Sequence, residues 1–323
     1  MKLTTEQSKR VQILRGLAII AVVFIHNTPS GVAQVFCRPF LNFAVGLFLF
    51  LSGMLSNSSN RNPKKRLVKV LIPYVLWTLI YSAMYNVSNP VCIPIAFLKN
   101  LLTGRAAAVM YYIFVYCEFT LLIPFIDRLA KSRFKYLGFI ITPVEIVVMR
   151  SIPLVAGLEM NKYISVIMSI SCLGWFTYFY LGYLMGNKLL FINTDSKKIP
   201  LLWIISILFQ FVEGGYYYTL GFENCGTQYK LTALISGVLF ALMAYNYILH
   251  GTNKSVKLLE LLGDNSFGIY FSHIAVMAVI RKIPWYTKLV AYPATAVVTI
   301  VITTILVLFG KRFFGKYSKY LAL

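Results

Sequence analysis

The chain has 323 residues, of which 59% are hydrophobic and 13% are charged. A soluble domain of average composition carries about 25% charged residues, so this composition excludes an ordinary soluble protein and indicates a polytopic membrane protein with a single domain over residues 1–323. The formal net charge of +21 does not indicate nucleic-acid binding, because the basic residues lie between apolar blocks, where membrane topology and anionic lipid headgroups account for them.

Apolar segments recur along the whole chain. A bilayer core requires about 20 mostly apolar residues per helix, and this criterion gives about ten candidate spans. They are centred near Ile20, Leu47, Leu76, Phe114, Val147, Tyr178, Ile207, Gly237, Ile274 and Ile302. The fifth is the least regular, because "ITPVEIVVMRSIP" contains Glu145, Arg150 and prolines. The sequence therefore predicts an all-α fold, a membrane bundle of about ten transmembrane helices.

An even number of spans places both termini on one side of the membrane. Most of the 31 Lys and Arg residues lie at span ends on that side, for example in "RNPKKRLVK" and "KRFFGKYSK". The positive-inside rule therefore predicts that both termini are cytoplasmic.

The five cysteines show no CxxC pattern and no Cys/His spacing typical of metal ligands, so the sequence predicts no metal site. Cys37, Cys92 and Cys225 lie near span ends that the predicted topology places outside. A pair among these three could form a disulfide in an oxidising compartment, and the spacing does not select the pair.

The first apolar segment, "RGLAIIAVVFIHN", begins with a cation and ends with an imidazole and an amide. Residues eleven apart on a helix are rotated by about 20° and lie about 16.5 Å apart along the axis, so Arg15 and His26 share one face. A thin ligand could lie along the apolar line from Gly16 to Val23, with an anionic head near Arg15 and a reactive end at His26. The simpler explanations are that Arg15 snorkels to the interface and that His26 only contacts a polar partner.

Other polar residues at membrane depth are weaker candidates. Asn27 could orient the His26 ring or an acceptor, or it could simply end the helix at the interface. Ser52 and Gly53 form a pair that often serves close helix packing, and we favour packing. Glu118 is an acid that needs a partner inside a membrane, and it could contact an acceptor or balance a cation.

Two further groups have structural explanations. Glu145 and Arg150 are five positions apart and therefore occupy different faces of a helix, so we do not expect them to pair. Asp264, Asn265 and Ser266 precede the ninth span, where such residues typically form an N-terminal cap.

Several stretches together resemble the acyltransferase 3 family of integral membrane acyltransferases. The family's first helix carries Arg, ten residues and then His, which Arg15 and His26 match. Its second helix runs into Ser-Gly, as in "VGLFLFLSGML", and a basic Arg-x-x-Arg run then leads through a proline, as in "KKRLVKVLIPYVLW". The fourth, sixth and ninth spans fit with "YYIFVYCEFTLLIPF", "FTYFYLGYLMG" and "LLGDNSFGIYFSHI". The basic run departs at Lys69, because Lys lacks the planar fork that Arg offers to phosphate.

The resemblance implies a membrane acyltransferase that takes an acyl group, most often acetyl and sometimes succinyl, from cytoplasmic acyl-CoA. The acceptor would be a hydroxyl of an extracytoplasmic or envelope carbohydrate, as in the O-acetylation of a polysaccharide. The protein would lie in the cell membrane, in bacteria the cytoplasmic membrane. No permanently bound cofactor is implied, because acetyl-CoA is a substrate.

On this resemblance His26 is the catalytic residue, either as a general base on the acceptor hydroxyl or as the carrier of a transient acyl-imidazole. Arg15, Lys65, Arg66 and Lys69 would receive the phosphates of acyl-CoA, although topology alone also explains this basic run. Possible support for the site comes from Asn27, Ser52, Glu118, Tyr270 and His273.

Two other classes of function fit parts of the pattern. A transporter or flippase for an envelope-glycan precursor would also use about ten helices with buried charges, but the sequence shows neither an inverted repeat nor a matching pair of broken helices. A binding or scaffold component of an envelope-polymer assembly would not need His26.

Overall fold

The computed structural model describes residues 3–57, 62–152, 155, 170–251 and 256–323. This part of the chain forms helices and no strand, which confirms the all-α prediction. Residues 141–152 are helical, and the remainder of the fifth predicted span lies outside the described residues. The other helices are α1 (Thr5–Asn27), α2 (Val32–Cys37), η1 (Arg38–Phe40), α3 (Phe43–Met54), α4 (Pro63–Tyr85), η2 (Pro90–Cys92), α5 (Ile93–Thr103), α6 (Tyr111–Lys131), η3 (Lys135–Phe139), η4 (Leu173–Trp175), α8 (Phe176–Gly186), α9 (Lys198–Thr219), α10 (Leu231–His250), α11 (Lys257–Asp264), α12 (Ser266–Ile280), α13 (Pro284–Leu289), α14 (Ala294–Phe314) and η5 (Gly315–Leu321).

Five helical segments within the described residues are long and apolar enough to cross a membrane. They are Val32–Met54, Pro63–Tyr85, Lys198–Thr219, Leu231–His250 and Ala294–Leu321. Each contains the centre of one predicted span. These spans agree with the sequence, whereas the total of about ten stays a prediction.

Two predicted spans, α8 and α12, are shorter than a bilayer core requires, with 11 and 15 residues. Every residue of α8 is buried. Gly182 brings the backbone of α8 against that of α3, where a Cβ would collide with the carbonyl of Phe50. Because α8 is enclosed by protein, its ends do not have to reach both membrane surfaces, which explains the short length.

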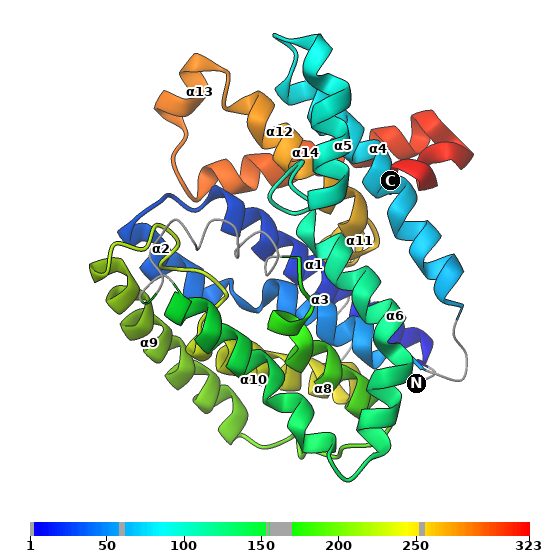
Figure 1. The fold of residues 1–323 in the computed structure, drawn as a ribbon, viewed down its shortest axis with the longest axis vertical. Helices are drawn as coiled ribbons and strands as arrows, with labels where there is room; N and C mark the ends of the chain where they lie inside the picture. Colours follow the sequence, from blue (N-terminus) through cyan, green and yellow to red (C-terminus); the bar gives the residue numbers. More distant parts are fainter. Residues whose placement is uncertain (1–2, 58–61, 153–154, 156–169, 252–255) are drawn as a thin grey trace.

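Helix α1 runs through the middle of the bundle and contacts α3, α10, α11, α12 and α14. Figure 1 shows α3, α8, α9 and α10 on one side of it and α4, α5, α12 and α14 on the other. The approach of α11 is especially close, because a Cβ at Gly16 would collide with the carbonyl of Leu259 and a Cβ at Gly263 with the carbonyl of Gln12. The helix that carries Arg15 and His26 is therefore held on several sides.

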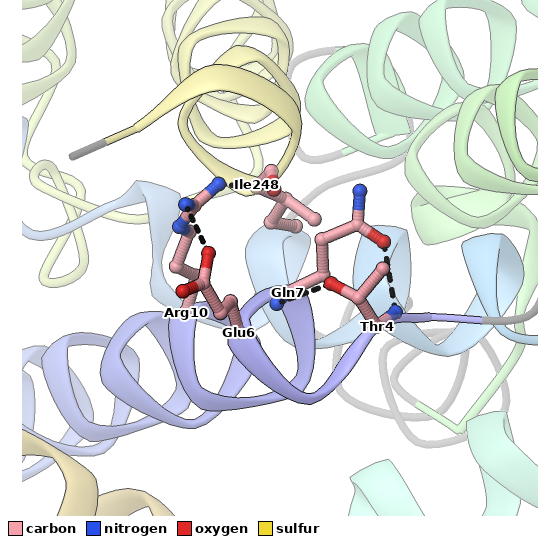
Figure 2. A network of polar contacts seen from close by, with 5 residues as sticks. All are labelled: Thr4, Glu6, Gln7, Arg10 and Ile248. Carbon is pink, nitrogen blue, oxygen red and sulfur yellow. Dashed lines mark hydrogen bonds and ion pairs between the residues drawn. The ribbon is translucent and has the colours of Figure 1, made fainter. Parts of the chain in front are cut away.

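Two sets of polar contacts fix the N-terminal end of α1 (Figure 2). Thr4 and Gln7 form a capping box, in which each side-chain oxygen accepts from the other residue's backbone N–H, at 3.1 and 3.2 Å. Arg10 Nη1 donates to the carbonyl of Ile248 at 3.0 Å, and Nη2 lies 3.5 Å from Glu6 Oε2. A guanidinium is favourable near the last carbonyls of a helix, so Arg10 ties α1 to the end of α10.

The outer helices turn apolar side chains outward and polar ones inward. In α9, Ile204, Leu208 and Val212 are exposed, whereas Gln210 is buried and accepts from Asn42 Nδ2 at 2.8 Å. A soluble protein shows the opposite arrangement. Lipid accounts for this one, because hydrocarbon solvates apolar side chains and cannot satisfy polar groups.

All five cysteines lie in the described residues and carry free thiols. The disulfide considered among Cys37, Cys92 and Cys225 is therefore not formed in this structure. The thiol of Cys225 instead donates to the carbonyl of Gly31 at 3.5 Å, in the connection that follows α1.

Candidate active site

A cavity of about 790 Å³ lies between α1, α4, α12 and the C-terminal segment that includes η5. Along α1 it extends from Gln12 to Val22, and along α12 it reaches Tyr270. The lining is mostly apolar and aromatic, with a few charged groups, which is the composition typical of sites for small molecules and cofactors.

Four cations line this cavity, namely Arg15 from α1, Arg66 and Lys69 from α4, and Lys319 from η5. Asp264 is the acidic residue in the lining. No described residue accepts a hydrogen bond from the Arg15 guanidinium or pairs with it. The excess of positive charge suits an anionic ligand, since phosphate oxygens form strong charge-assisted hydrogen bonds with Arg and Lys.

The cations in the first turns of α4 point in two different directions, and only some of them line the cavity. Arg66 and Lys69 are three residues apart, share a face of the helix and line the cavity. Arg66 Nη1 also donates to Ser56 Oγ at 3.1 Å, which links α4 to the end of α3. Lys65 is exposed and is not part of the lining. The structure thus brings Arg15, Arg66 and Lys69 together and leaves Lys65 outside.

His26 and His273 lie side by side near the other end of α1, with 5.4 Å between their ring centroids. His273 is fully buried, and its Nδ1 lies 2.9 Å from the carbonyl of Ile269 in the preceding turn of α12. A carbonyl can only accept, so Nδ1 carries the hydrogen and the neutral ring presents Nε2 as an acceptor. Nε2 is buried without a hydrogen-bond partner, and no described residue forms a hydrogen bond with the ring of His26.

The cavity approaches this histidine pair along both helices. Val22 in its wall is one turn before His26 on α1, and Tyr270 is three residues before His273 on α12. The rings of Tyr270 and His273 are 6.4 Å apart, and the Tyr270 hydroxyl donates to the carbonyl of Val109. Basic groups, cavity and imidazoles therefore follow one another along α1.

Comparison with known proteins gives one decisive match: the acyltransferase 3 family model, described as an acyltransferase domain, matches residues 9–309. The chain belongs to the acyltransferase 3 family. No similar curated protein and no similar solved structure is found. The match runs from α1 into α14, so it covers every helix around the cavity except η5. The protein is a multi-pass membrane acyltransferase, which confirms the resemblance seen in the sequence.

In this acyltransferase, two of the residues predicted to support the site, Asn27 and Glu118, form hydrogen bonds with backbone groups outside the cavity. Asn27 Nδ2 donates to the carbonyl of Val23 at 2.9 Å, within its own helix. Glu118 Oε2 accepts from the backbone N–H of Cys172 at 2.6 Å. Neither residue lines the cavity. These contacts favour the structural explanation of both side chains.

Ser52 and Gly53 lie where α3 packs closely against α8. A Cβ at Gly53 would collide with the carbonyl of Phe179, and the carbonyl of Ser52 accepts from Ser56 Oγ at 2.8 Å. Ser56 in turn accepts the hydrogen bond from Arg66. The Ser-Gly pair thus contributes to packing and, through Ser56, to the position of a cavity cation.

Glu145 and Arg150 do not form an ion pair with each other. This agrees with their five-residue spacing, which places them on different faces of a helix. Arg150 Nε donates to the carbonyl of Tyr229 at 2.7 Å. The carboxylate of Glu145 is buried, and neither of its oxygens has a hydrogen-bond partner among the described residues.

The predicted side-chain cap of α12 is wrong. Asn265 is the N-cap residue, but its Nδ2 donates back to the carbonyl of Leu261 at 2.6 Å and no side-chain cap bond forms. The reason is that α11 ends only one residue earlier, so Asn265 closes α11 rather than opening α12. Asp264 contributes to the cavity wall instead.

Two further cations near the site, Lys319 and Arg38, were not predicted from the sequence. Lys319 follows the last span and reaches the cavity because η5 folds back onto α4, where Trp77 Nε1 donates to the carbonyl of Leu321 at 3.0 Å. Arg38 is close enough to His26 to act on it electrostatically. Arg38 could have been noticed in the sequence, because it is a cation on the predicted outer side, where the positive-inside rule predicts few basic residues.

Proposed function

We propose that this acyltransferase moves an acyl group, acetyl in the first instance, from cytoplasmic acyl-CoA to a hydroxyl of an extracytoplasmic or envelope carbohydrate. The observation that carries the proposal is a single cavity that has cations in its wall and approaches His26 and His273 along α1. Acyl-CoA suits this layout because its phosphates are anionic, its arm is thin and its thioester lies at the far end. On this proposal the protein works in a bacterial cytoplasmic membrane.

The phosphates of the donor are assigned to Arg15, Arg66, Lys69 and Lys319. An Arg can hold two phosphate oxygens through its planar fork, whereas each Lys contributes a point charge. Arg66 is the best placed for a fixed geometry, because its bond to Ser56 limits the motion of the guanidinium. Lys65 is exposed outside the cavity and contributes charge at a distance.

His26 acts as the general base. It removes the proton from the acceptor hydroxyl while that oxygen attacks the thioester carbon, and the carbon–sulfur bond then breaks. The imidazolium returns the proton to the departing CoA thiolate, so the ring ends neutral. An imidazole suits both steps because the neutral ring can accept a proton and the protonated ring can return it.

His273 is assigned a positioning role. With Nδ1 held by the carbonyl of Ile269, its Nε2 is an unpartnered acceptor on a ring whose centroid lies 5.4 Å from that of His26. An N–H of His26 turned toward that nitrogen leaves the other nitrogen of His26 free to act as base, the arrangement in which a third group orients the catalytic base.

A two-step route through an acyl-imidazole on His26 uses the same residues. Ping-pong kinetics would favour this relay, and kinetics through a ternary complex would favour the general base. Membership of the acyltransferase family favours either route over the transporter alternative.

The test of the proposed function is mass spectrometry of envelope carbohydrates from cells with and without the gene. We expect one acyl group to be lost from one class of sugar when the gene is deleted and to return with the wild-type gene. Purified protein should also gain thermal stability from acetyl-CoA but not from free adenine nucleotides. Unmodified carbohydrate crossing the membrane, with no change in acylation, would contradict the proposal.

A further inference from the structure

Arg38, in η1, follows the end of α1 that the predicted topology places outside, and it has no acidic partner among the described residues. Its Nε is buried without a hydrogen bond, and no described residue forms an ion pair with its guanidinium. Its electrostatic neighbours are Tyr111, Cys225 and Tyr292, whose side chains are uncharged near neutral pH. A cation that is partly removed from water is costly unless something compensates for it, and the described part of the protein does not.

The surroundings of His26 repeat this excess of positive charge. The charged groups that act on its ring are the guanidinium groups of Arg38 and Arg281. The acids nearest to this region, Glu145 and Glu213, act on Tyr229 and Lys230, and neither is among the groups that act on Arg38 or on His26. The outer approach to the catalytic imidazole is therefore cationic.

Neither topology nor packing accounts for Arg38. The positive-inside rule explains cations on the cytoplasmic side, and Arg38 follows the outer end of α1. The aliphatic part of its side chain packs against Gly226, where an added Cβ would come within 2.8 Å of Arg38 Cγ. This contact holds the side chain against the bundle and directs its polar end into the same region as Tyr111 and His26.

We propose that Arg38 binds an anionic group of a substrate on the outer side of His26, so that one of the two substrates is acidic beyond the CoA phosphates. The inference rests on the proposed function and specifies its substrate class. A guanidinium holds a carboxylate through two parallel hydrogen bonds and so fixes its orientation as well as its position. The carboxylate belongs either to the acceptor, as in an acidic sugar, or to the far end of a dicarboxylic acyl group.

The first experiment identifies the product by mass spectrometry of envelope carbohydrates from cells with and without the gene. An acetyl group on an acidic sugar supports the proposal with the acceptor as source, and an acidic acyl group on a neutral sugar supports it with the donor as source. An acetyl group on a neutral sugar overturns this inference but leaves the proposed function intact. No gene-dependent acylation overturns both.

The second experiment compares Arg38→Gln and Arg38→Lys with Arg105→Gln, which removes an exposed arginine between α5 and α6. We expect Arg38→Gln to reduce the product at least tenfold, Arg38→Lys to retain part of it, and Arg105→Gln to match the wild type. Each purified variant is checked for wild-type thermal stability, so that a folding defect is separated from lost binding. Wild-type product from Arg38→Gln overturns the proposal.

Thermal stabilisation by two donors separates the sources of the anionic group. Loss of stabilisation by succinyl-CoA but not by acetyl-CoA in Arg38→Gln assigns the carboxylate to the acyl group. Unchanged stabilisation by both donors, together with loss of product, assigns it to the acceptor. Loss of stabilisation by acetyl-CoA as well overturns the proposal, because acetyl-CoA has no anionic group near His26.

Discussion

The ring of His273 shows how one backbone contact can decide the chemistry of a side chain. Its Nδ1 is committed to the carbonyl of Ile269, so only Nε2 is available to the site. The nearby ring of His26 has no such contact with a described residue, so neither of its nitrogens is committed to a backbone carbonyl there. The two imidazoles are therefore not equivalent, and this difference is the reason that we assign the proposed role of general base to His26 rather than to His273.

Replacing His26 with Gln should reduce acyl transfer by about 10²- to 10⁴-fold, the usual contribution of a general base. Stabilisation by acetyl-CoA should persist, because the cations that bind the donor lie at the other end of α1. The chain has three histidines, and His250, exposed at the end of α10, supplies the matched control. His250→Gln should be as active as the wild type. Full activity of His26→Gln would remove His26 from the mechanism.

Arg66 and Lys65 are adjacent on α4, but only Arg66 lines the cavity, so Lys65 provides a matched control for a substitution of Arg66. Arg66→Ala should weaken acetyl-CoA binding by about tenfold or more, since a hydrogen bond to a charged group contributes about 1.5–3 kcal/mol. Lys65→Ala should have a much smaller effect, because Lys65 lies outside the cavity. Isothermal titration of the purified variants measures both. Equal losses would show that charge density, rather than the geometry of Arg66, governs donor binding.

At the scale of helices, the contact between α1 and α11 holds the catalytic helix. Gly16→Ala should lower the free energy of unfolding by about 1–3 kcal/mol, the typical cost of overpacking, because the new methyl group would meet the Leu259 carbonyl. Gly215→Ala in α9 is the control, since nothing lies within 4 Å of its position. It should be neutral or slightly stabilising, because Ala favours a helix more than Gly does. Thermal unfolding in the same detergent compares the stability of the two variants with that of the wild type. A Gly16→Ala variant as stable as the wild type would show that α11 can move away from the new methyl group.

The sequence predicted helices well where hydrophobicity alone determines them. The apolar runs around Leu76, Ile207, Gly237 and Ile302 each lie in one long helix. The prediction of span length was less accurate for α8, which is surrounded by protein rather than lipid. Hydropathy does not distinguish such an enclosed helix from one that spans the bilayer. The sequence also did not predict that α11 and α12 follow each other almost directly, which removed the expected cap.

At the scale of the molecule, helical spacing predicted the shared face of Arg15 and His26 on α1, and the family resemblance predicted the cations on α4. Arg15, Arg66 and Lys69 meet around one cavity as expected. Lys319 and Arg38 could not be predicted, since a folded-back segment and an outer connection bring them there. Gly16, expected to lie along the ligand, packs against α11 instead.

The distribution of charge along α1 also predicts from which side the donor enters. Arg15 and Lys319 lie on elements near the two chain ends, and the positive-inside rule places those ends in the cytoplasm. Acetyl-CoA carries several negative charges and cannot cross the hydrocarbon core unaided. The donor should therefore react only when it is supplied on the side of the termini.

Sealed membrane vesicles of opposite orientation test this asymmetry. Inside-out vesicles, which present the cytoplasmic face to the medium, should release free CoA from added acetyl-CoA and acylate acceptor in the lumen. Right-side-out vesicles should show almost no release until detergent opens them, and protease cleavage of tags at the two termini should confirm each orientation. The His26→Gln variant in inside-out vesicles provides the background rate. Equal rates in both sealed preparations would mean that acetyl-CoA reaches the site from either face, which would contradict the direction of entry predicted from the cations and histidines along α1.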